Sequence, residues 1–303
     1  MHELPPPVRP PTTPQQRLAG VLWTIAAMGL LAGMAGFAKA AAQEGAGVLH
    51  ILLGRSLVVT LLGLAVALLR GEPLLGQRRG LLALRGLAGV GALLLFLVAV
   101  TRITVGETIV VHKANPLFVA LLAPWLLGER AGRATLIAIP IGLAGVALIV
   151  RPGLPVEATV GGLAAIGSAL LTAFAYLYLR ALTLTEASST IVFWLGGMGV
   201  LVGLAGLAPD FTLPPQRALW LIACGGACAG TGQFLLTRAF RLLDAASAST
   251  ASYSQVAFGY LLGWLALGET SHPLAWLGTL LVVAACLVVA WSKGPGSEVR
   301  PRS

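Results

Sequence analysis

Long apolar segments, more than any short motif, limit what this chain can fold into. A helix of about 20 apolar residues crosses the roughly 30 Å hydrocarbon core of a membrane. Ten such segments are found near residues 18–41, 46–69, 81–100, 105–127, 133–150, 158–180, 188–208, 216–239, 246–267 and 273–291. They use most of the chain, and the loops between them are too short to form a soluble domain.

The composition supports a membrane environment. Only 10% of the residues are charged and the mean hydropathy is +0.89, whereas soluble domains carry about 25% charged residues. Backbone groups in lipid must be hydrogen-bonded within the protein, so only helices and closed barrels span membranes. The sequence lacks the alternating pattern of a membrane barrel. We therefore predict an all-α membrane protein with ten transmembrane helices.

One pattern occurs twice. A Leu-Gly-Glu segment closes an apolar stretch at Glu129 and again at Glu269, and an offset of 140 residues also aligns Asn115 with Gln255. Internal repeats are common in transporters. We predict two five-span repeats at 18–151 and 157–292, a disordered cytoplasmic tail at 1–17 and a second cytoplasmic tail at 293–303.

The distribution of Lys and Arg predicts the orientation. With a cytoplasmic N-terminus, fourteen of these residues fall at inner span ends, Arg85 among them, and four at outer ends, which is a strong positive-inside bias. Both termini are then cytoplasmic, and two repeats of five spans each are inverted relative to one another. The +9 net charge is spread over several loops, which argues against nucleic-acid binding. The preference for Arg over Lys, with abundant Ala and Gly, suggests a bacterial inner-membrane protein.

Four segments carry a family resemblance: residues 50–55 (His-Ile-Leu-Leu-Gly-Arg), the stretch from Asn115-Pro-Leu-Phe to Leu-Gly-Glu-Arg130, residues 142–146 and residues 232–240 (Gly-Gln-Phe-Leu-Leu-Thr-Arg-Ala-Phe). With these segments in this order, the chain resembles the EamA-type drug/metabolite transporters from about residue 18 to 291. Some of these segments look like a subgroup that includes S-adenosylmethionine carriers. The resemblance implies a central cavity lined by spans 1, 3, 4, 6, 8 and 9, with spans 5 and 10 peripheral or forming a homodimer.

Polar residues within the spans are the candidates for substrate binding, because polar groups in lipid are costly and should face the interior. The candidates on spans 4, 8 and 9 are His112, Lys113, Asn115, Gln233, Ser252, Tyr253 and Gln255. Residues three apart share a helix face, so 112/115 and 252/255 place polar groups at matching positions of the two repeats. Each has a structural alternative: His112 can bond a neighbouring helix, and Gln233 can hold helices together.

Arg55 lies about ten residues into span 2, too deep to reach the membrane surface easily. We expect it either to pair with a carboxylate or carbonyl, in a structural or gating role, or to contact an anionic group of the substrate. Glu107 is expected to favour the N-terminus of its helix. Glu129 and Glu269 are expected to stabilise the turns at span ends.

The sequence therefore predicts an inner-membrane transporter of a small polar or amphipathic metabolite, such as an amino acid, a nucleoside or an S-adenosylmethionine-like compound, working by alternating access. The alternatives are a flippase for lipid-linked substrates and a membrane scaffold that transports nothing. No cofactor, metal or enzymatic activity is expected: Cys224 and Cys228 have no His or carboxylate beside them on their helix, and no nucleophile–base cluster or nucleotide-binding motif is present. The expected partners are a small-molecule substrate and the lipid bilayer.

Overall fold

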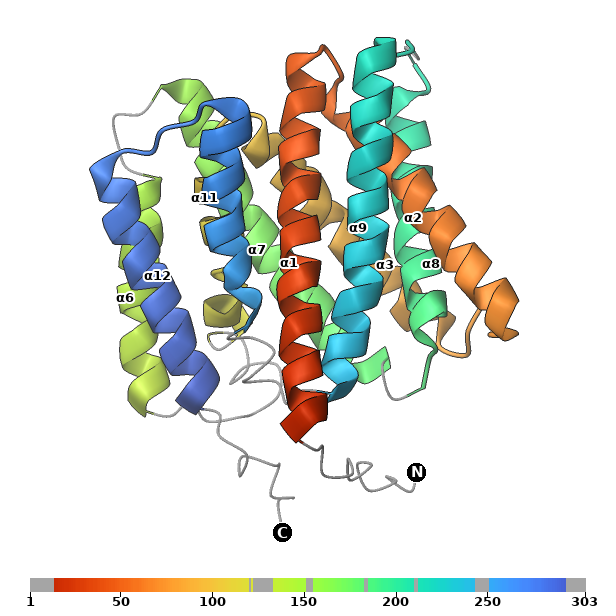
Figure 1. Ribbon diagram of the computed structural model, residues 1–303, viewed down its shortest axis with the longest axis horizontal. Coiled ribbons are helices and arrows are strands. Elements are labelled where there is room, and N and C mark those ends of the chain that lie inside the picture. The colour runs from red at the N-terminus through yellow and green to blue at the C-terminus, as the bar shows by residue number, and fades with distance from the viewer. Residues whose placement is uncertain are drawn as a thin grey trace.

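The computed structural model describes residues 14–119, 121, 133–150, 155–182, 185–209, 212–242 and 251–292. These residues form long helices that lie side by side (Figure 1). The helices are α1 (Pro14–Gln43), α2 (Val48–Arg70), α3 (Arg79–Val100), α4 (Val105–His112), α6 (Arg133–Ile149), α7 (Val156–Leu182), α8 (Ser188–Leu207), α9 (Gln216–Leu242), α11 (Ser254–Leu267) and α12 (Pro273–Ser292).

The helix bounds follow eight of the ten predicted spans within a few residues. By length and composition, six described helices can cross a membrane, and α6, α11 and α12 contain shorter apolar stretches. The predictions for spans 4 and 9 were wrong in one respect, because each described helix is interrupted. Helix α4 ends at His112, and α11 begins only at Ser254. The predicted disordered tail was too long, because residues 14–17 belong to α1. Residues 1–13 and 293–303, Glu129 and parts of spans 4 and 9 lie outside the described residues.

Each helix of the first half packs against a helix of the second half. The contacting pairs are α1 with α9, α2 with α8, α3 with α7, α4 with α11, and α6 with α12. Within α2 and α8, Ser56 faces Gly199 and Leu53 faces Gly203, so the numbers rise on one helix as they fall on the other. The same reversal holds in the α3 and α7 pair, where Arg102 at one end is joined to Glu157. These pairs are antiparallel.

Helices α6 and α12 form a separate pair at one side of the bundle (Figure 1). Besides each other they contact α4, which agrees with the expected peripheral position of spans 5 and 10. Their backbones approach closely at two glycines: a Cβ at Gly145 would lie 2.7 Å from the Gly278 carbonyl oxygen, and one at Gly278 would lie 2.6 Å from that of Gly145. In lipid there is little hydrophobic driving force between helices, and small residues at such crossings allow the close van der Waals packing that holds the pair together.

Figure 1 also shows that α1 begins and α12 ends at the same end of the bundle. We refer to this as the terminal end. The opposite end contains the loops that follow α1, α3 and α11, and we refer to it as the distal end. An even number of membrane crossings places the start of the first helix and the end of the last helix on the same side of the bundle.

Candidate functional site

The interruption of α4 has a local cause. Pro116 has no N–H to bond the carbonyl of His112, and its ring disfavours continued helix. The chain instead makes a turn at Lys113, with the Ala114 N–H donating to the Val111 carbonyl at 3.1 Å. The side-chain amide of Asn115 donates to the His112 carbonyl at 3.0 Å. Asn115 thus supplies the hydrogen bond that proline removes, a role that our prediction of substrate contact did not include.

Lys113 lies at this turn and is only 8% exposed. Its ammonium donates a long contact of 3.5 Å to the Met28 sulfur on α1. Its backbone carbonyl, released by the turn, accepts the Tyr253 hydroxyl at 3.3 Å and lies 3.7 Å from the Cys286 sulfur. The structure therefore brings two predicted site residues, Lys113 and Tyr253, into direct contact between α4 and α11.

His112 belongs to a hydrogen-bonded chain across three helices. Ser168 on α7 donates to the Ala92 carbonyl on α3 at 2.7 Å. Its hydroxyl has one proton, so the 2.9 Å contact between its Oγ and His112 Nδ1 requires that Nδ1–H donate. The His112 ring also meets the edge of Phe96, with ring centroids 5.1 Å apart. This is the structural alternative considered for His112, and it fixes the ring while leaving Nε2 without a hydrogen bond among the described residues.

The remaining predicted site residues are spread over the second half. Gln255, two residues after the Tyr253 turn, is 5% exposed. Ser252 precedes that turn and is half-buried, and Gln233 is half-buried in the middle of α9. The structure thus gathers His112, Lys113 and Tyr253 around the interrupted helices.

Arg55 is 6% exposed at the contact of α2 with α9, where a Cβ at Gly226 would come within 3.3 Å of its Cα. Its Nε has no hydrogen-bond partner, and no carboxylate pairs with it in the described part of the chain. Among the described residues, Arg55 therefore lacks the carboxylate partner that was one of the expectations for a structural role.

Arg85, which was predicted to lie among the arginines at inner span ends, is buried within the bundle. It is 8% exposed, and its Nε also has no hydrogen-bond partner. Its side chain runs along α3 to Gly89, where a Cβ would collide with Nη1. The Tyr176 phenol on α7 lies close enough to interact with the guanidinium electrostatically. The glycine at position 89 was the sequence signal for this burial.

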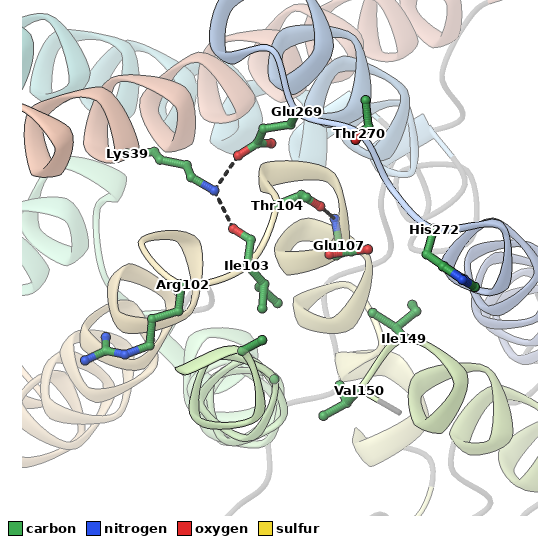
Figure 2. A pocket seen from close by; sticks show the side chains of 12 residues that line it. Lys39, Arg102, Ile103, Thr104, Glu107, Ile149, Val150, Glu269, Thr270 and His272 are labelled. Carbon is green, nitrogen blue, oxygen red and sulfur yellow. Dashed lines mark hydrogen bonds and ion pairs between the residues drawn. The ribbon is translucent and has the colours of Figure 1, made fainter. Parts of the chain in front are cut away.

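At the distal end the structure contains a cavity of about 410 Å³ between the two halves of the chain. Figure 2 shows Lys39 of α1 and Glu269 of the loop after α11 pointing toward one another across it. The two side chains form an ion pair and are 14% and 11% exposed. The Lys39 ammonium also donates to the Ile103 carbonyl at 2.6 Å, and Glu269 accepts the Val105 N–H at 2.8 Å. Glu269 therefore does more than stabilise its own turn: it joins α1, α4 and the loop after α11.

Glu107 lines the same cavity (Figure 2). Its carboxylate does not cap the helix, because Thr104 is the N-cap residue of α4 and accepts the Glu107 N–H on its hydroxyl at 3.2 Å. An acidic side chain in the first turn still favours the positive end of the helix dipole. His272 faces the cavity from the other half of the chain.

Comparison with known proteins identifies what this architecture resembles. A family model described as "EamA-like transporter family" matches residues 18–151 and 159–291. A pseudopaline exporter of Pseudomonas aeruginosa is 28% identical over 245 residues, which cover 80% of this chain and 86% of the exporter. An uncharacterised transporter of Helicobacter pylori is 30% identical over 248 residues, covering 78% of this chain and 83% of that protein. A riboflavin transporter of Rhizobium johnstonii is 30% identical over 193 residues, or 62% of each chain.

One solved crystal structure has a TM-score of 0.62 with this chain at 22% identity, covering 89% of this chain and 96% of that one. At this identity the likeness concerns the fold.

Proposed function

Because the chain belongs to the EamA-like transporter family, we propose that it carries a small polar or amphipathic metabolite across the bacterial inner membrane by alternating access of two inverted five-helix repeats. Its relatives named as transporters support the general activity, a membrane transporter of small metabolites. The proposed substrate classes are amino acids, nucleosides and S-adenosylmethionine-like compounds.

One observation carries the proposal. Lys113 and Tyr253 are 140 residues apart, the offset of the sequence repeat. Each marks an interruption of its helix, with a bond of i to i−3 type beside it: Leu117 N–H to Ala114 oxygen at 2.9 Å, and Val256 N–H to Tyr253 oxygen at 3.0 Å. The two equivalent positions touch through the Tyr253 hydroxyl. Interrupted helices that meet at equivalent positions are typical of substrate sites between inverted repeats.

The helix pairing supports the inversion. The α4–α11 pair is antiparallel as well, because Gly106 faces Tyr260 while Lys113 contacts Tyr253. So is the α6–α12 pair, in which Gly142 faces Ala285 and Gly145 faces Leu281. Three of the antiparallel pairs join counterparts of the two repeats: α2 with α8, α4 with α11, and α6 with α12. The other two, α1 with α9 and α3 with α7, exchange with each other when the halves are exchanged. This pattern is what a two-fold axis in the membrane plane would produce, because such an axis reverses helix direction while it maps one half onto the other.

In this mechanism the halves rock around the contact of Lys113 with Tyr253. The Lys39–Glu269 ion pair would hold the distal end together in one state and separate in the other, which would admit substrate to the polar residues near His112. Energy must come from a gradient of ions or substrate, because the sequence contains no nucleotide-binding motif. The hydrogen bonds of Ser168 to His112 and to the Ala92 carbonyl join α4, α7 and α3. During the motion these three helices would move together, or these hydrogen bonds would change partners.

Transport by purified protein in liposomes tests the proposal. A panel of labelled amino acids, nucleosides and sulfonium compounds is supplied outside, and metabolite profiling of cells that lack or overproduce the protein guides the choice. We expect at least one compound to accumulate, and Gln255→Ala to reduce uptake at least about fivefold. Gln216→Ala is the matched control, since Gln216 is exposed at the start of α9.

Two results would contradict the proposal. The first is a combined result: the purified protein transports no compound of the panel, and cells carrying His112→Ala or Gln255→Ala keep the metabolite profile of the wild type. The other concerns topology: reporters fused to the two ends should both lie in the cytoplasm, and an external C-terminus would exclude the inverted arrangement.

A further inference from the structure

The interior of the bundle has an excess of positive charge. Among the described residues, the buried ionisable side chains that carry charge at neutral pH are Arg55, Arg85 and Lys113, at 6%, 8% and 8% exposure. No described Asp or Glu is buried to the same degree. A buried cation is costly unless something compensates it, and within a membrane-spanning segment such a residue marks a pathway or a site.

Neither arginine has its counter-charge within the described protein. The Nε atoms of Arg55 and Arg85 make no hydrogen bond, and the four ion pairs of the described residues involve other side chains. Among the described side chains, the Lys113 ammonium contacts the Met28 sulfur and lies near the Cys286 thiol. Among the described residues, then, neither guanidinium has the carboxylate partner that a structural ion pair requires.

The three cations lie near the same depth. Taking a rise of about 1.5 Å per residue, Arg55 is about 6 Å from the middle of α2 (Val48–Arg70). The guanidinium of Arg85 reaches Gly89, about 1 Å from the middle of α3 (Arg79–Val100). Lys113 follows the eight residues of α4, about 12 Å from the distal end of that helix. All three are therefore within about 6 Å of mid-depth.

The three cations all belong to the first half of the chain, and each lies where its helix packs against the second half. The Arg55 backbone lies against α9 at Gly226, the Arg85 guanidinium interacts electrostatically with Tyr176 of α7, and the Lys113 carbonyl accepts the Tyr253 hydroxyl at the start of α11. The positions 140 residues later hold Leu195, Gly225 and Tyr253. The second half thus contributes no charge of either sign at the matching positions, and the cations of the first half are left for a ligand between the halves.

We infer that the site between the repeats takes an anionic metabolite, one that bears carboxylate or phosphate groups. The inference rests on the proposed transport function and narrows its substrate class. A guanidinium offers a planar pair of donors that matches carboxylate and phosphate oxygens, and a low-dielectric interior strengthens the attraction. Arg55, Arg85 and Lys113 are then specificity-determining residues, and the anion supplies the charge that the described protein lacks.

Matched pairs of compounds test the class. Proteoliposomes and detergent-purified protein are given glutamate against glutamine, and riboflavin 5′-phosphate against riboflavin, with citrate and glycerol 3-phosphate as further anions. We expect anionic members to raise the melting temperature and to be taken up, and neutral partners to be at least about tenfold weaker. Arg55→Gln and Arg85→Gln should each reduce uptake of the anion at least about tenfold. Arg217→Gln, at an exposed arginine on α9, is the control and should keep full uptake.

The melting temperature without ligand separates a binding role from a structural one. Arg85→Gln removes a buried charge that has no partner in the described protein, so its melting temperature should equal or exceed that of the wild type, while stabilisation by the anion is lost. A fall beyond that of Arg217→Gln would mean that the guanidinium is paired within the protein, and would overturn the inference.

Two transport outcomes are distinguishable. If neutral or cationic compounds are taken up as well as or better than their anionic partners, the substrate class is wrong and the proposed transport function stands. If the protein takes up no compound of either kind in this panel or the broader one, the transport function fails and the class fails with it.

Discussion

Replacing Lys39 with glutamine removes one side of the ion pair that joins the two halves at the distal end. In the structure Lys39 binds both Glu269 and the Ile103 carbonyl, and Glu269 also accepts the Val105 N–H. Both charged side chains are largely buried, at 14% and 11% exposure. The substitution therefore leaves a carboxylate that is mostly shielded from water and has one neutral backbone donor.

The expected magnitude follows from this burial. Two unit charges about 4 Å apart attract by about 4 kcal/mol at an effective dielectric constant of 20, and desolvation offsets part of that attraction. Taking about 2 kcal/mol as the net loss, the closed distal end becomes about 30-fold less favoured, because each 1.4 kcal/mol is a factor of ten. An exposed pair contributes only about 0–1 kcal/mol. The Arg217–Glu44 pair, with side chains 80% and 36% exposed, is therefore a suitable control.

Cysteine labelling measures the closed population. Ile149 lines the distal cavity and is 4% exposed, so Ile149→Cys, in a protein whose native cysteines are replaced by alanine, should react slowly with a membrane-impermeant maleimide. Lys39→Gln should raise the labelling rate by about 30-fold, and Arg217→Gln by less than about twofold. Thr270→Cys, at an exposed position of the same cavity, should label at one rate throughout.

A double-mutant cycle provides the refutation. If the two charges act on each other, Lys39→Gln together with Glu269→Gln should label no faster than the single variants, because the second substitution removes a group whose partner is already gone. Additive effects, or an unchanged labelling rate in Lys39→Gln, would show that the pair does not hold this end closed.

Two further predictions concern helix packing and capping. Gly145→Ala should lower the melting temperature in detergent by the equivalent of about 1–3 kcal/mol, because its Cβ would meet the Gly278 carbonyl at 2.7 Å. Gly197→Ala, where the Cβ would have no atom within 4 Å, should instead gain up to about 1 kcal/mol of stability from helix propensity. Changes of the same sign in the two variants would contradict the packing argument. Thr104→Ala removes the acceptor of the Glu107 N–H and should cost about 1 kcal/mol, measurable as faster hydrogen exchange in the first turn of α4, while Thr104→Ser should exchange like the wild type.

The helices were largely predictable because apolar length is a local property of the sequence. The interruption at Lys113 has a sequence signal in Pro116, whose missing N–H leaves the His112 carbonyl without its helical donor. What sequence reasoning did not find is that Asn115 supplies that donor, because the same amide could equally have faced a substrate.

Two features depend on tertiary contacts that the sequence does not specify locally. Arg85 lies close enough to the start of its span to be counted as an inner-end charge, but its guanidinium runs along α3 to Gly89 and is buried where α3 packs against other helices. Glu269 was read as part of a turn because its partner, Lys39, is 230 residues away in the sequence. Burial and pairing of charges depend on which helices meet, and no local pattern specifies that.

The three buried cations have a consequence for the response to voltage. Moving one elementary charge through a membrane potential of 100 mV involves about 2.3 kcal/mol, so an empty site that passed Arg55, Arg85 and Lys113 through the whole field would involve about 7 kcal/mol. Neutralisation by a bound anion would reduce this amount. In the proposed mechanism the membrane potential therefore holds the empty carrier toward one face, and the loaded carrier returns more easily. Such a protein would exchange one anion for another faster than it carries anions in a single direction.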